Sequence, residues 1–274
     1  MPVPRGKTET VEMEEKNGKP SELAEAMMKY LDCECRYFPP MPDDAELCAA
    51  YFDALRGAAD GGYVPMLIKV DETLFECLIM NSDPDSDGED DYSFDATKVA
   101  AYRREQLSRE LPDGREILKG YLVDRREEAE DDEIDWDREI VGAVEGGEEI
   151  DCFSAYRDYR SDETAPVILA KIPVKHAWEI FAYLPFGAWN DCPDTEELMA
   201  VTKYWTEQYG AWPSTMSHDE LEFFLPAPVP ENRALELAIE HYGFCPDIID
   251  QGVHPLGALA DSLSRSKIWY FWWD

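Results

Sequence analysis

Basic side chains are scarce in this sequence. Its 274 residues include 25 Lys and Arg against 60 Asp and Glu, which gives a formal net charge of −35. Proteins bind nucleic acids and acidic membranes through Lys and Arg that neutralise phosphate, so this balance excludes ordinary binding to DNA, RNA or such membranes. We expect no direct nucleic-acid partner and no membrane partner.

Long apolar runs are missing as well. No run approaches the roughly 18 residues that a membrane-spanning helix needs. The opening MPVPRGKTETVEMEEKNGKP also lacks the apolar stretch that a signal peptide has. We therefore expect a cytoplasmic protein in which residues 1–20 form a disordered tail.

The motifs of the common cofactor enzymes are absent too. The sequence contains no Gly-x-Gly-x-x-Gly, no Gly-x-x-x-x-Gly-Lys-Ser/Thr loop, no Gly-x-Ser-x-Gly and no His-Glu-x-x-His. Its seven cysteines are scattered along a long chain, whereas a disulfide framework is typical of short secreted proteins, so we expect reduced thiols, most of them buried. We expect no organic cofactor, and the sequence favours a protein that is not an enzyme.

The sequence does contain enough apolar residues to form a core, because hydrophobic residues make up 45% of it. Apolar residues at helical spacing predict helices over 21–31, 44–59, 95–110, 176–184, 194–210, 234–242 and 256–263. Short apolar or alternating runs predict strands over 63–70, 167–172, 220–225 and 268–273, and residues 74–80 fit either state. Helices and strands interleave, which indicates an α/β or α+β fold with a mixed sheet and flanking helices, its topology left open.

The composition changes near Glu163, where an acidic region gives way to an aromatic one. We expect residues 21–162 to be an acidic N-terminal α/β region with acidic insertions. We expect residues 163–274 to be an aromatic-rich C-terminal domain, because seven of the eight tryptophans lie in this part.

The chain ends in five consecutive aromatic residues and an acid, WYFWWD. We expect this ending to be an inner strand that is buried on both faces of its sheet. The alternative is that some of the rings line a ligand or partner cleft, since tryptophan is enriched at binding hot spots. Trp189 and Trp272 are the candidates for such contacts.

The acidity is concentrated in two stretches. Residues 81–95 contain seven acids and no base, and residues 124–149 contain thirteen acids against three arginines, so together they hold −17, about half of the total. Opposite charge accelerates encounter and selects partners, so these stretches predict a basic protein partner. An acidity that serves only solubility is the alternative. The candidate partner-binding acids are Asp85, Asp87, Asp90, Asp131 and Asp132.

One acidic stretch also resembles a calcium loop. Asp83, Asp85 and Asp87 alternate and are followed by Gly88, as in the first half of an EF-hand loop. The twelfth position is Phe94 where a bidentate Glu is required, so a solvated acidic loop is the favoured interpretation and calcium the alternative.

Two loops share the triplet Cys-Pro-Asp, in NDCPD (190–194) and in FCPDIIDQG (244–252). Proline in the first helical turn and a capping Asp explain the triplet structurally. The functional interpretation is a pocket at which both loops converge, with a cysteine nucleophile paired with histidine, although the surrounding negative charge would raise the pKa of the thiol. The candidate catalytic residues are Cys192, Cys245, His241, Asp247 and Asp250.

The motifs LPFGAWNDCP (184–193), FCPDIIDQG (244–252) and WYFWWD (269–274) resemble an uncharacterised bacterial family, domain of unknown function 4253. The resemblance implies a bacterial, cytosolic, compact α/β-type protein and supplies no activity and no catalytic residue. The resemblance also implies a link to toxin-immunity genes, with which proteins of this kind are sometimes grouped. The hypothesis is therefore an acidic immunity or inhibitor protein that neutralises a basic toxin or effector. The alternative is a small-ligand-binding protein or hydrolase that uses the two Cys-Pro-Asp loops.

Overall fold

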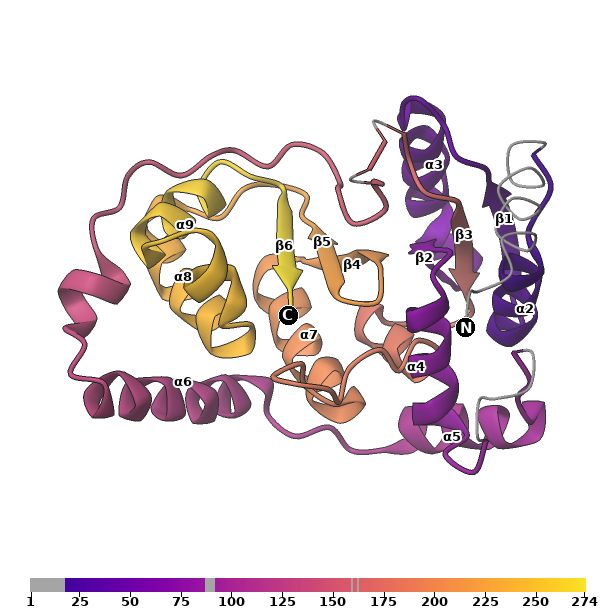
Figure 1. Ribbon diagram of the computed structural model, residues 1–274, viewed down its shortest axis with the longest axis horizontal. Helices are drawn as coiled ribbons and strands as arrows, with labels where there is room; N and C mark the ends of the chain where they lie inside the picture. The colour runs from indigo at the N-terminus through magenta and orange to yellow at the C-terminus, as the bar shows by residue number, and fades with distance from the viewer. Residues whose placement is uncertain (1–17, 87–91, 159, 162) are drawn as a thin grey trace, which may run out of the picture.

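In the part of the chain that the structure describes, a mixed sheet of six strands forms the centre of the molecule (Figure 1). The structure, a computed structural model, describes residues 18–86, 92–158, 160–161 and 163–274. The strand order is β1-β3-β2-β4-β5-β6; β2 and β4 are parallel, and every other neighbouring pair is antiparallel. The mixed sheet with flanking helices is confirmed, and of the two classes that the sequence left open, α/β and α+β, the structure is α+β. The strands are β1 (Glu34–Phe38), β2 (Val64–Lys69), β3 (Val167–Ile172), β4 (Trp212–Met216), β5 (Glu220–Phe224) and β6 (Ile268–Trp272).

Helix α7 shows how capping residues in the sequence determine where a helix begins and ends. Asp194 and Glu197 form a capping box at the start of α7, and Gly210 ends that helix in the left-handed conformation with φ of 69°. The α-helices are α2 (Glu22–Leu31), α3 (Ala45–Gly61), α4 (Glu72–Ser82), α5 (Ala96–Ser108), α6 (Gly114–Asp131), α7 (Thr195–Tyr209), α8 (Glu231–Phe244) and α9 (Leu256–Leu263). Shorter turns are the π-helices η1 (Trp136–Val141) and η3 (Ile248–Gly252) and the 3-10 helix η2 (Ala177–Ala182).

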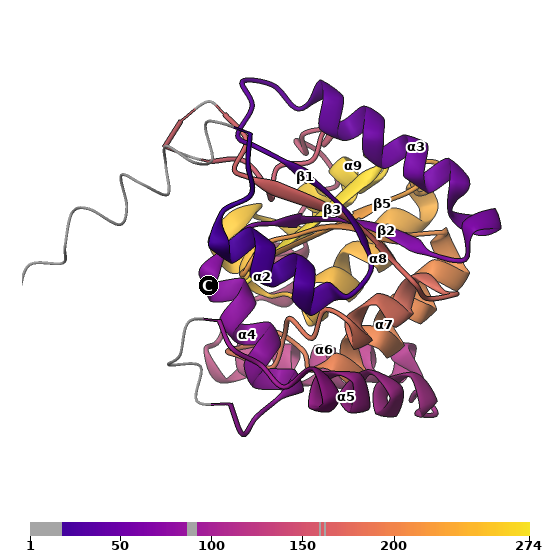
Figure 2. The ribbon, with the colours of Figure 1, turned by 90° about the vertical axis from the view of Figure 1, so that its right-hand side faces the viewer.

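The two faces of the sheet are covered differently (Figure 2). Helix α3 lies on one side, and α5, α6 and α7 lie on the other. Along β2, Met66 and Ile68 belong to the larger hydrophobic core, on the side of α5, α6 and α7. Leu67 belongs to a smaller core under α3. Because β2 lies inside the sheet and both faces are covered, residues 64–68 are buried without alternation, and Lys69 at the end of the strand is half-buried.

The aromatic ending forms β6, but the expectation of an inner strand is wrong, because β6 is an edge strand. Trp269 and Phe271 are buried on the face of the sheet that α7 covers. There the ring of Phe271 stacks on Trp205 of α7, with the ring centres 5.5 Å apart. Tyr270 and Trp272 on the opposite face are half-buried. Packing of helices against one face therefore buries these rings, and a second neighbouring strand is not needed.

Both regions of the chain contribute to the one sheet. Strand β2 of the N-terminal region lies between β3 and β4 of the C-terminal region. Most of the tail 1–20 lies outside the described residues. Among the residues that the structure describes, no helix is long and apolar enough to cross a membrane.

Candidate functional site

Residues 124–149, which we call the acidic segment, cover the second half of α6, the turn η1 and the extended chain that follows. Figure 1 shows this chain passing around α8 and α9 on its way to β3. All thirteen of its acidic side chains are exposed. Within the described residues, only Glu128, Asp135 and Glu139 of the thirteen form ion pairs. The segment thus presents a line of carboxylates to solvent with most of their charge uncompensated.

The acidic segment is fixed at both ends. On α6, Leu118 and Ala129 are buried, and the helix packs against α7 and α8. Beyond the other end, the carboxylate of Glu222 on β5 accepts hydrogen bonds from the backbone N–H of Ser154 at 2.8 Å and from its Oγ at 2.9 Å. Burial raises the pKa of Glu222 to about 7, although these donors favour the charged form. The carboxylates are therefore held on an anchored scaffold.

Exposed apolar side chains accompany these carboxylates. Val123, next to the segment, and Ile134 and Val144 within it are three of the exposed large hydrophobic side chains in the described part of the chain. Val253 is another, and Pro255 close by packs against Gly142 of the segment. The same surface therefore offers negative charge and small apolar contacts.

The structure brings the two Cys-Pro-Asp loops together at the end of β6. Asn190 Nδ2 donates to the carbonyl oxygen of Asp274 at 2.6 Å, and the N–H of Asp274 donates to Oδ2 of Asp247 at 3.0 Å. The thiol of Cys245 donates to the carbonyl oxygen of Trp272 at 2.9 Å. The last residues of the chain thus join both loops.

Arg125 connects these loops to the acidic segment. Its guanidinium lies 3.0 Å from Glu128 on the same helix and 3.9 Å from Asp191 in the first loop. It also opposes the rise in the pKa of Asp250 in the second loop, a rise caused mainly by partial desolvation of that carboxyl group. Asp191 and Asp250 are exposed. We call the acidic segment together with Asp191, Asp247, Asp250 and Asp274 the acidic surface.

The cysteines of the two loops lie in an environment that keeps them neutral. Cys192 and Cys245 are buried, and burial raises the pKa of both thiols far above the ordinary value. All seven cysteines are free thiols, as expected, but these two are the buried ones: Cys152 is exposed and the rest are half-buried. Neither loop therefore holds a thiolate that could act as a nucleophile.

His241 is part of the aromatic core. Its ring lies 4.7 Å from the ring centroids of Trp269 and Phe271, it is fully buried, and burial lowers its pKa to about 3. Its Nε2 has no hydrogen-bond partner within the described residues. A histidine in this environment stays neutral and is too weak a base to activate Cys245.

The carboxylates of the second loop are used to hold the loop. Asp247 accepts from Gln251 Nε2 at 2.9 Å as well as from Asp274, and Asp250 accepts from the hydroxyl of Tyr242 at 3.1 Å. These hydrogen bonds give both carboxylates a structural role in the loop. They provide no support for a catalytic role.

The candidate metal ligands surround a lysine. Asp83 is buried, and its Oδ1 lies 3.0 Å from Lys98 Nζ, which also lies 3.1 Å from Oδ2 of Asp85. Lys98 therefore supplies the positive charge that these carboxylates need. Asp87 and Asp90 lie outside the described residues, and no group of three or more metal-ligating side chains occurs in the part that is described.

The two tryptophans considered for partner contact are half-buried. Trp189 donates through Nε1 to the carbonyl oxygen of Phe186 at 3.2 Å, and Trp272 donates to Oδ2 of Asp219 at 3.2 Å. Trp189 lies in the loop beside Asn190, so its exposed part borders the acidic surface. Trp272 lies on the sheet face opposite α7.

The sequence did not point to a polar cluster at the ends of the parallel strands. His218 follows β4 and Asp71 follows β2, and His218 Nδ1 lies 3.1 Å from Asp71 Oδ2. This hydrogen bond raises the pKa of His218. The position of Asp71 directly after a predicted strand was the available signal, but β4 was not predicted, and without it His218 could not be placed.

Comparison of the chain with curated proteins gives no match, and comparison with solved structures gives none either. The family resemblance read from the C-terminal motifs is confirmed by a profile match that begins within β3 and includes both Cys-Pro-Asp loops and β6. Residues 168–274 of this chain match the family described as domain of unknown function (DUF4253).

Proposed function

We propose that this chain is a cytoplasmic bacterial binding protein that neutralises a basic protein partner, as an immunity or inhibitor protein does for a basic toxin or effector. The observation that supports the proposal most is the acidic segment, in which thirteen exposed carboxylates lie on one continuous, anchored stretch. Clustered charge of one sign steers a partner of opposite charge and disfavours other partners.

The placement of these acids argues against a stabilising role. The last turn of α6 contains no basic residue, and Glu127 and Asp131 are four residues apart on the same face. Negative charge at a helix C-terminus costs about 0.3–1 kcal/mol per group, and a like-charged pair at this spacing costs about 0.2–0.5 kcal/mol. Because these acids destabilise their own helix, the stability of the fold does not explain their presence. Contact with a partner would explain it.

The surface also indicates the chemistry of the partner. Lys and Arg side chains combine a cationic end with an apolar stem, so a basic face can satisfy the carboxylates and cover Val123, Ile134 and Val144 at once. The acids of the two loops extend the same surface, because Arg125 joins Asp191 to α6. The partner that fits is a protein with a basic face, not a free cation.

A small-ligand binder or hydrolase at the two loops is the second proposal, and the geometry favours it less. Cys192 and Cys245 are buried and neutral, and the carboxylates of Asp247 and Asp250 are engaged in hydrogen bonds within the loops and to the chain end. The loops converge, but the groups that would react are used in holding them together.

The test compares two variants that lose the same number of charges. The first, Glu127→Gln with Asp131→Asn and Asp132→Asn, neutralises part of the acidic segment. The control, Asp53→Asn with Asp60→Asn and Glu76→Gln, neutralises exposed acids on α3 and α4. Each tagged protein is used to capture partners from a bacterial lysate at about 50 mM and about 300 mM salt, and bound proteins are identified by mass spectrometry.

We expect a basic protein to be retained at low salt by the unmodified chain and by the control, and to be lost from the first variant and at high salt. Retention of the same protein by both variants, or an affinity that salt does not change, would contradict the proposal.

A further inference from the structure

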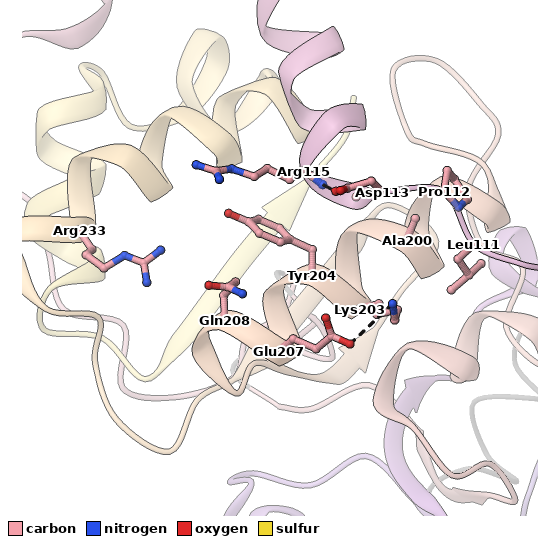
Figure 3. A pocket seen from close by; sticks show the side chains of 11 residues that line it. Leu111, Pro112, Asp113, Arg115, Ala200, Lys203, Tyr204, Glu207, Gln208 and Arg233 are labelled. Carbon is pink, nitrogen blue, oxygen red and sulfur yellow. Dashed lines mark hydrogen bonds and ion pairs between the residues drawn. The ribbon is translucent and has the colours of Figure 1, made fainter.

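A polar cavity lies between three helices at the end of α6 opposite to the acidic segment (Figure 3). Its volume is about 460 Å³, and it is bounded by the first turn of α6, the outer face of α7 and the start of α8. Small-molecule sites commonly have volumes of about 300–1,000 Å³. The polar side chains around it include Arg115, Lys203, Tyr204, Glu207, Gln208 and Arg233.

Close helix packing determines the shape of the cavity. A Cβ at Gly114 would lie 2.2 Å from the carbonyl oxygen of Ala200, so only glycine lets α6 begin this close to α7. Asp113 caps α6 by accepting from the N–H of Arg115 at 2.9 Å. These two contacts fix the backbone from which the side chain of Arg115 extends.

A buried carboxylate behind the cavity fixes the position of Tyr204, one of its lining residues. Glu240 of α8 is buried and accepts from the hydroxyl of Tyr204 at 2.8 Å and from Trp205 Nε1 at 3.1 Å. Tyr204 is therefore oriented by a group behind it, and its ring forms a fixed surface of the cavity.

The acids of the lining already have partners. Glu207 lies 3.7 Å from Lys203 Nζ, and Asp113 is the cap of α6. Arg115 lies 3.4 Å from Glu236, but both side chains of this pair are about half exposed, and such pairs contribute little. Arg115 is thus free to exchange this partner for a better one.

Arg233 has no carboxylate partner among the described residues, in a chain with 60 acids. Its guanidinium donates to the hydroxyl of Tyr209 at 2.9 Å and lies 4.7 Å from the centre of the Tyr209 ring. These contacts orient the group without neutralising it. Figure 3 shows the guanidinium groups of Arg115 and Arg233 on the same side of Tyr204 and Gln208, with a space between them.

We propose that this cavity binds a small molecule through an anionic oxygen group, a carboxylate or a phosphate, held between Arg115 and Arg233. A guanidinium presents several N–H donors in one plane and binds both groups in a bidentate manner. The Gln208 amide offers a further hydrogen bond to the body of the ligand. The site is separate from the acidic surface and does not depend on the proposed function.

The test measures binding of inorganic phosphate and of succinate to the full chain by calorimetry, at about 150 mM NaCl so that the long-range field of the acidic chain is screened. Succinamide, the neutral counterpart of succinate, is the ligand control. The variants are Arg115→Gln and Arg233→Gln, and Arg104→Gln, an exposed arginine of α5 outside the cavity, is the matched control.

We expect phosphate, succinate or both to bind to the unmodified chain and to Arg104→Gln, and to bind at least about tenfold more weakly to each lining variant, since hydrogen bonds to charged groups are lost. Phosphate alone would assign a phosphate ligand, and succinate alone a carboxylate. Because Arg115 is exposed enough to be replaced without unfolding, its variant remains informative if Arg233→Gln fails to fold. No binding of either probe at about 10 mM, equal binding of succinamide, or unchanged affinity in Arg115→Gln would overturn the proposal.

Discussion

The protonation state of a core residue depends on its surroundings in the fold, which its residue type does not reveal. His241 was a candidate base because it precedes Cys245 by one helical turn, yet in the fold it is enclosed by Trp205, Trp269 and Phe271. Desolvation disfavours its charged form, and no group among the described residues compensates for it. Its role is to fill the core as a neutral ring.

This burial predicts a loss of stability in acid. The pKa of His241 is about 3 in the folded chain and 6.5 without the protein environment, so the unfolded chain binds more protons between these values. The free energy of unfolding should therefore fall as the pH drops from about 6.5 towards 3, by up to about 1.4 kcal/mol per pH unit from this group. Urea unfolding of the unmodified chain and of His241→Gln between pH 4 and 8 measures this, and the variant should lack that part of the slope.

His218 provides the control, because its shift has the opposite sign. The hydrogen bond that His218 donates to the carboxylate of Asp71 raises the pKa of His218, so its stabilising contribution is complete below the unfolded value and is lost as the pH rises through the folded value. His218→Gln should therefore change the pH dependence only above about 6.5, where it removes a gain in stability on acidification, and should leave the slope that His241 causes below about 6.5 in place. Equal slopes for the unmodified chain and His241→Gln would show that His241 is accessible to protons in the folded state.

At the scale of elements, local sequence signals predict where helices begin. Asp95 and Asp194 cap α5 and α7 as their positions predict, because a cap depends only on a few neighbouring residues. The strands β1 and β4 were missed. Their sequences, ECRYF and WPSTM, contain no continuous apolar run, and they are strands because they pair with β3 and with β2 and β5.

In the candidate site too, features set by neighbouring residues can be predicted from the sequence, whereas features set by tertiary contacts cannot. Exposure of the acidic segment could be predicted, because a run so rich in carboxylates cannot be buried. The cavity could not be predicted, since Gly114, Tyr204 and Arg233 come from three helices that only the tertiary structure brings together. The burial of Asp83 was also unpredictable, because it depends on Lys98 reaching it from another helix.

The end of α6 is the element for which stability and function should separate. Asp131→Asn and Asp132→Asn remove negative charge from the last turn and from the cap of a helix that has no base there. Each change should raise the free energy of unfolding by about 0.3–1 kcal/mol, measured by urea unfolding at low salt. Asp60→Asn, at the end of α3 where the last turn also lacks a base, serves as the comparison outside the acidic segment.

The two variants in α6 are also expected to lose the basic partner. A gain in stability together with a loss of binding cannot be explained by partial unfolding, so it would separate a contact role from a structural one. A drop in stability in both variants would mean that these carboxylates make contacts that hold the fold.

At the scale of the whole molecule, the net charge of −35 opposes folding, because the compact chain brings its carboxylates closer together than the unfolded chain does. Between about 10 mM and 150 mM NaCl the Debye length falls from about 30 Å to about 8 Å, which screens this repulsion. The melting temperature should rise over this range by about 2–4 °C for each 1 kcal/mol of relieved repulsion, while binding of a basic partner should weaken.

The two triple variants have the same net charge, so their salt responses compare clustered with dispersed acids. Because interactions between charges grow as their separation shrinks, neutralising Glu127, Asp131 and Asp132 should reduce the rise in melting temperature more than neutralising Asp53, Asp60 and Glu76. Scanning calorimetry of both variants measures the difference, and a melting temperature that falls with salt would show that attractive ion pairs outweigh the repulsion.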